Sequence, residues 1–174
     1  MAQNIYGGKV PSAASWVLPG LVAGLVFAMW AMMVGIFTPG SNFLAPPQGI
    51  AQSVGIGEPG HAFQALPFVA GLVGHMMNSI ILGAIFVAIA RAIHLRGVAA
   101  IVGGMVYGGM LYIAMYWVLL RGLLAGTSAS FLSANPEWSW ILAHLMFGAV
   151  LGGLVAYGPL RHRTFEPSTQ HAVA

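Results

Sequence analysis

The stretch that decides the fold is residues 67–93, PFVAGLVGHMMNSIILGAIFVAIARAI. Its only charged residue is Arg91, close to its end. Since about 20 apolar residues are enough to cross a bilayer as a helix, this stretch is predicted to be a transmembrane helix. Three further stretches of the same kind lie at residues 16–37, 98–120 and 138–160.

The other architecture that can span a membrane is the β-barrel, which is built from segments of about 10 residues with alternating hydrophobicity. The sequence has no such segments. We therefore expect residues 1–174 to form a single all-α domain, a four-helix transmembrane bundle.

The composition excludes several classes of protein. Hydrophobic residues make up 59% of the chain and charged residues only 5%, whereas a soluble domain carries about 25% charged residues. This excludes a soluble enzyme, a disordered chain and a protein that binds nucleic acid through a basic face. The chain has no cysteine, which excludes disulfides and iron–sulfur clusters. It also lacks a Ser/His/Asp set, a phosphate loop and an HExxH motif, so we expect it not to be an enzyme by itself.

The placement of the charged residues predicts how the chain is threaded. One side of the predicted membrane carries five basic residues, whereas the other carries Arg121 with Glu58 and Glu137. The positive-inside rule then places both the N and the C terminus in the cytoplasm. The five basic residues of the cytoplasmic side are Lys9, Arg91, Arg96, Arg161 and Arg163.

The loop between the first and second helices, residues 38–66, is long and rich in glycine and proline. A connection of this length in a compact protein is usually functional or packed as a cap. We expect it on the outer side of the membrane, with one short interfacial helix at residues 48–54.

An internal repeat relates the two halves of the chain. His75 and His144 are each followed eight residues later by a glycine, Gly83 and Gly152. We interpret the chain as two copies of a helical hairpin in the same orientation, related by an axis along the membrane normal. Each copy carries small residues four apart, which allow helices to approach closely in lipid; they are Gly20/Gly24, Ser79/Gly83, Gly104/Gly108 and Gly148/Gly152.

The two histidines inside the spans are the strongest candidates for chemistry. Counted at about 1.5 Å per residue, His75 and His144 lie at similar depth on helices that run in the same direction. An ionisable residue within a span is a functional hypothesis by default. Two of them facing each other predict a haem b with two imidazole ligands, or else a copper ion or a chlorophyll magnesium. The alternative is that both serve as hydrogen-bonding links between helices.

Three further residues are candidates for the same chemistry. Arg121, at the outer end of the third helix, is placed to pair with a haem propionate, or alternatively with Glu137 or Glu58. Met29 and Met33 lie on one helix face, and thioether sulfur selects Cu(I), although methionines at helical spacing also fill cores.

Short motifs in all four helices support a family resemblance: the glycine-rich first helix, Gly71-x-x-x-His75, Gly104-x-x-Tyr107-Gly108 and His144-Leu145-Met146-Phe147-Gly148. In these the chain resembles an uncharacterised family of small bacterial four-helix integral membrane proteins. The resemblance implies a multi-pass protein of the bacterial inner (cytoplasmic) membrane. The family has no settled activity, so the resemblance implies no function.

Three functions fit these observations. The chain is expected to be a non-catalytic accessory or anchor subunit of a larger membrane complex for electron transfer, with haem b between His75 and His144. A purely structural packing subunit without cofactor is the second reading. The third is a small copper or metal transporter that uses Met29 and Met33. The expected partners are the lipid bilayer and other membrane subunits or further copies of the chain.

Overall fold

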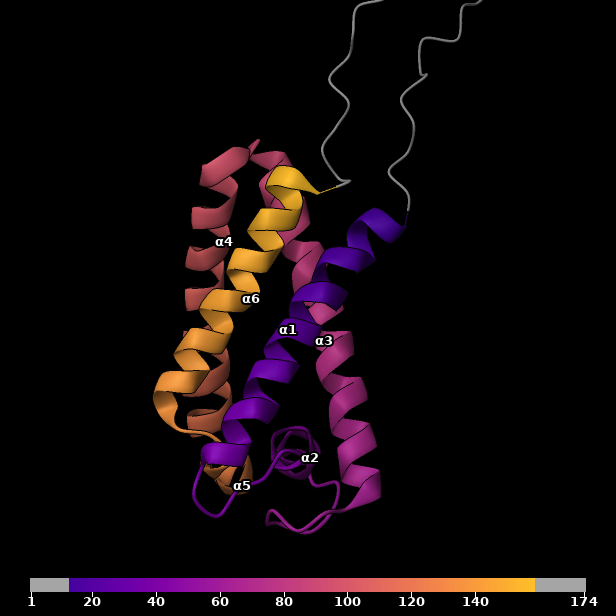
Figure 1. Cartoon of the computed structure of the whole chain (residues 1–174), viewed down its shortest axis with the longest axis vertical. Helices are drawn as coiled ribbons and strands as arrows, with labels where there is room; N and C mark the ends of the chain where they lie inside the picture. The colour runs from indigo at the N-terminus through magenta and orange to yellow at the C-terminus, as the bar shows by residue number, and fades with distance from the viewer. Residues whose placement is uncertain (1–12, 159–174) are drawn as a thin grey trace, which may run out of the picture.

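The computed structural model describes residues 13–158, and every regular element in this range is a helix (Figure 1). Four stretches are long and apolar enough to cross a membrane, which confirms the prediction of four spanning helices. They are α1 (Ala14–Phe37), α3 (Ala65–Ala92), the continuous stretch of α4 (Gly97–Tyr112) and the π-helix η1 (Ile113–Leu123), and α6 (Glu137–Tyr157). The expectations that involve Lys9, Arg161 and Arg163 lie outside the described residues.

The four spans form two tightly packed pairs. α1 packs along α3, and α4 packs along α6, while the pairs meet mainly through α1 and α6. α3 makes few contacts with α4 and η1, although it is linked to α4 by a short loop (Figure 1). One side of the bundle is therefore less filled than the other.

Glycine is what allows the close approach within each pair. A Cβ added at Gly104 would collide with the carbonyl oxygen of Gly148, and a Cβ at Gly148 would collide with that of Gly104. In the other pair, Gly20 lies directly against the backbone at Ser79 and against Gly83. Because lipid provides no hydrophobic force between helices, such backbone contact is a main source of stability in a membrane.

Two short helices, α2 (Ala45–Ser53) and α5 (Ala129–Ser133), lie at the end of the bundle opposite the ends of the described chain (Figure 1). We call residues 38–64 together with residues 124–136 the cap. The short helix expected at residues 48–54 is present, but it spans Ala45–Ser53 and most of its residues are buried against the rest of the chain. Gly71 makes room for it, because a Cβ there would collide with the carbonyl oxygen of Pro47.

Buried glutamines tie the cap together. The Gln52 side chain donates to the backbone carbonyl oxygens of Glu58 at 2.7 Å and Gly60 at 3.0 Å. The Gln48 side-chain oxygen accepts a hydrogen bond from the backbone N–H of Gln64. A loop in an apolar setting must have its backbone groups satisfied, and these amides supply partners that water supplies elsewhere.

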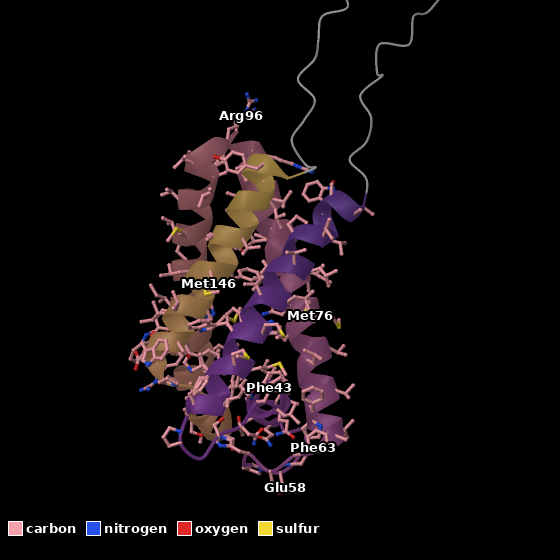
Figure 2. All side chains as sticks on the ribbon, viewed as in Figure 1. Phe43, Glu58, Phe63, Met76, Arg96 and Met146 are labelled. Carbon is pink, nitrogen blue, oxygen red and sulfur yellow. The ribbon has the colours of Figure 1, made fainter. Side chains whose placement is uncertain are left out.

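Within residues 13–158, charged side chains mark the two ends of the bundle. Arg96 stands at the end where α1 begins, and Glu58 stands at the opposite end, on the cap (Figure 2). At the first of these ends the Arg91 guanidinium lies over the Trp16 ring, 4.2 Å from its centroid. This amphipathic pair suits the headgroup region of a bilayer.

Candidate functional site: an apolar cavity with two imidazoles

A cavity of about 480 Å³ lies where α3 and η1 stand apart. This is within the range of roughly 300–1,000 Å³ that holds small molecules and cofactors in proteins. α2 and α5 of the cap form one end of the cavity. Beyond its other end, Tyr107 joins α4 to α3, because its hydroxyl donates to the Leu82 carbonyl oxygen at 2.9 Å. Since α3 and η1 barely touch, little helix packing closes the cavity between them.

Both predicted histidines line this cavity, one from α3 and the other from α6. The ring of Phe27, on α1, contacts both imidazoles, with centroid distances of 5.2 Å to His75 and 4.9 Å to His144. The structure thus brings the two rings to one place in the bundle. Phe27 could not be identified from the sequence, because an aromatic residue in an apolar span has no polar or periodic signature.

His144 is held in the orientation typical of a ligand. It is only 7% exposed, and its Nδ1 donates to the backbone carbonyl oxygen of Trp140 at 2.7 Å. A hydrogen bond at one ring nitrogen fixes the tautomer and leaves the other nitrogen with a free lone pair. Nε2 of His144 is therefore the atom able to bind a metal or accept a hydrogen bond from a ligand.

His75 has the opposite arrangement. Its Nε2 donates to the carbonyl oxygen of Gly24 at 3.0 Å, which links α3 to α1 and leaves Nδ1 with the lone pair. His75 therefore acts as the link between helices that was the alternative expectation, although it also lines the cavity. Before Nε2 of His75 can bind a metal, the ring must give up the bond to Gly24.

Asn78 is a further polar residue of the cavity. It lies one turn along α3 from His75, lines the cavity and has no hydrogen-bond partner among residues 13–158. An unpaired amide in the middle of a span is costly in lipid. Its signal in the sequence was an amide side chain three residues after His75, within a largely apolar helix.

Arg121 lies at the cap end of η1, beside the cavity. Its guanidinium donates to the Tyr116 hydroxyl at 3.0 Å and lies 3.8 Å from the Glu137 carboxylate. The pairing with Glu137 that was one of the alternatives is thus present, and Glu137 also accepts a hydrogen bond from Tyr112 at 3.1 Å. Tyr116 lines the cavity, whereas Arg121 lies behind it and does not line the cavity itself.

Met29 and Met33 lie away from the cavity. Their side chains are 51% and 46% exposed on the outer face of α1. Within residues 13–158 there is also no cluster of three or more His, Asp or Glu side chains able to hold a metal ion. The sulfur atom that does line the cavity belongs to Met115, on η1.

The double variant Met29→Leu/Met33→Leu tests the metal-transport reading. Leucine conserves the volume of methionine, and both side chains face outward, so we expect wild-type stability and unchanged copper content by elemental analysis of the purified protein. A loss of copper in this variant, with the fold intact by circular dichroism, would favour the metal transporter.

The chain has no match among known proteins in three comparisons: no protein-family model, no curated protein and no solved structure is similar to it. Its function is therefore argued from the cavity and its lining residues.

Proposed function

We propose that the protein is a small, non-catalytic accessory or anchor subunit of a membrane electron-transfer complex and that its cavity holds haem b. The observation that carries this proposal is that His75 and His144, from two different helices, line one apolar cavity of sufficient size. Bound haem would supply a one-electron redox centre within the membrane, and the complex to which the subunit belongs would use it.

The donor set fits haem b, and His144 would be the first residue to hold its iron. Its Nε2 is free and its ring is already oriented by Trp140. His75 would be the second ligand after its ring turns away from Gly24. Arg121, acting with the Tyr116 hydroxyl, would neutralise a carboxylate at the cap end of the cavity, because Arg offers a forked donor to such groups.

We further propose that the two helix pairs are the two copies of a hairpin repeat. Support comes from the matching use of small residues, since Gly20 meets the backbone of Ser79 in one pair as Gly104 meets that of Gly148 in the other. The proposed orientation, with both termini in the cytoplasm of a bacterium, is supported by Arg96 at one end of the bundle and by Glu58 at the other. Arg91 adds to the first end from the last turn of α3, and Glu137 adds to the second from the first turn of α6.

The purely structural packing subunit is less well supported. Glycine-lined helix faces would let such a subunit pack closely against partners, but the faces that carry the paired glycines are already covered by the chain's own helices. The glycines that meet backbone or side-chain atoms of a neighbouring helix are Gly20, Gly24, Gly83, Gly104, Gly108, Gly148 and Gly152.

The visible absorption spectrum of the protein purified from haem-supplied cells tests the cofactor. We expect a reduced-minus-oxidised difference band and one haem per chain. His94→Ala is the matched control, since His94 lies in the exposed loop between α3 and α4, outside the cavity, and this variant should keep the full band. A colourless wild-type protein under these conditions would contradict the proposal.

A further inference from the structure

We propose that His61 is a pH-sensitive latch that holds the cap more firmly over the end of the cavity when its imidazole is protonated. The inference rests on the cavity that the proposed function uses, but it does not depend on haem being the ligand. His61 lies in the loop between α2 and α3 and is partly exposed, so protons from water reach it.

Each ring nitrogen of His61 faces a backbone carbonyl oxygen from a different segment of the cap. Nδ1 lies 2.5 Å from the oxygen of Gly40, and Nε2 lies 3.0 Å from that of Ser130, on α5. A neutral imidazole has only one N–H, whereas an imidazolium has two. Only the protonated ring can therefore donate to both carbonyls and join residues 38–44 to α5.

Ser133 gives the neutral ring a weaker alternative. Its hydroxyl lies 3.3 Å from Nε2 of His61 and 3.1 Å from the Ser130 carbonyl oxygen, to which it donates. When the ring is neutral and Nδ1 donates to Gly40, this hydroxyl can turn and donate to Nε2 instead. The Ser130 carbonyl oxygen then loses the hydrogen bonds that it accepted from the side chains of His61 and Ser133. The link between His61 and α5 depends on the longer bond from the Ser133 hydroxyl to Nε2 of His61.

The electrostatic surroundings of His61 are simple. Residues 38–44 and residues 129–135, which carry its partners, contain no Asp, Glu, Lys, Arg or other His. The nearest titratable group in its own loop is Glu58. The Asn42 side chain donates to the His61 carbonyl oxygen at 2.7 Å, which fixes the loop backbone at any pH. The change in bonding with pH therefore arises at the ring.

The segments joined by His61 shape the cavity. Phe131, which follows Ser130 on α5, lines it, as do Ile50 and Ser53 of α2. Gly60, next to His61, donates from its backbone N–H to the Ser130 side chain at 2.9 Å. Loosening the His61 link therefore loosens the end of the cavity that the cap closes.

Hydrogen exchange of the full chain in lipid nanodiscs tests the latch at about pH 5 and about pH 8, the range over which histidine changes charge. After correction for the intrinsic pH dependence of exchange, we expect amides of residues 38–44 and 129–135 to be about tenfold more protected at the lower pH, the size of one charge-assisted hydrogen bond. His61→Gln should abolish this difference, and the matched control His94→Gln should keep it. Ser133→Ala should enlarge it, because the neutral ring then loses its alternative donor.

Equal protection of the wild type at both pH values, or a pH effect that persists in His61→Gln, would overturn the proposal. If His61→Gln does not fold, nitrogen NMR of histidine-labelled wild type decides. Two protonated, hydrogen-bonded ring nitrogens at His61 are expected at the lower pH, and a ring that stays neutral there would be contrary to the latch. None of these readouts involves haem, so a failure of the latch and a failure of the haem proposal are separate results.

Discussion

Replacing His144 by alanine is expected to abolish the haem band, whereas replacing His75 by alanine is expected to leave haem bound with one axial ligand. The difference follows from the hydrogen bonds. His144 presents a free Nε2 and is positioned by the Trp140 carbonyl, while Nε2 of His75 is engaged by Gly24. The loss of an oriented ligand removes the strongest single contact to the cofactor.

Absorption spectra and haem content of the two variants measure this prediction. His144→Ala should recover part of the band when free imidazole is added, because the small molecule can occupy the space left by the side chain. His75→Ala should keep most of its haem but with the spectrum of a high-spin iron. Equal retention of haem in both variants would show that neither imidazole is the ligand.

The close contact between α4 and α6 is expected to contribute strongly to the stability of the bundle. Gly148→Ala is expected to destabilise the protein by roughly 1–3 kcal/mol, the usual cost of overpacking a close contact. The reason is that the added Cβ meets a backbone atom of Gly104, which cannot rotate away as a side chain would. The midpoint of unfolding in a titration with sodium dodecyl sulfate measures the change.

Gly153→Ala is the matched control for this prediction. Gly153 lies on the same helix, and a Cβ added there has open space around it. Alanine favours the helix by about 1 kcal/mol over glycine, so this variant should be as stable as the wild type or more stable. If both variants unfold at the same point, close packing at Gly148 does not stabilise the bundle.

The spanning helices could be predicted from the sequence because lipid leaves few choices. Residues 67–93 were predicted as a helix, and α3 covers Ala65–Ala92. The glycines of the helix pairs were also identifiable, since small residues four apart have few other uses in a membrane. These features depend on the local chain and its solvent, and they need no knowledge of distant contacts.

The cap could not be predicted in the same way. Residues 45–53 have moderate hydropathy, and their burial depends on Gly71 and on Phe131, which are far away in the sequence. α5 was missed because a helix of one turn has no periodic pattern. The π-helix η1 was missed because its residues have the composition of an ordinary α-helix, and wide turns of this kind are frequent at functional sites.

The candidate site was predicted in part. His75 and His144 were identified from their depth and spacing, and both line one cavity. The sequence could not indicate which ring nitrogen of each histidine donates to a backbone carbonyl oxygen. It also could not indicate that Phe27 lies against both rings. It also could not separate Met29 and Met33 from the site, since a helical spacing does not tell which face is turned inward.

The central claim is that the imidazoles of His75 and His144 hold one haem together. Electron paramagnetic resonance of the oxidised wild-type protein tests it most directly, because it distinguishes iron with two strong axial ligands from iron with one. We expect a low-spin ferric signal in the wild type that becomes high-spin in His75→Ala and disappears in His144→Ala. A wild-type protein without any haem signal, or a low-spin signal that persists in either variant, would contradict it.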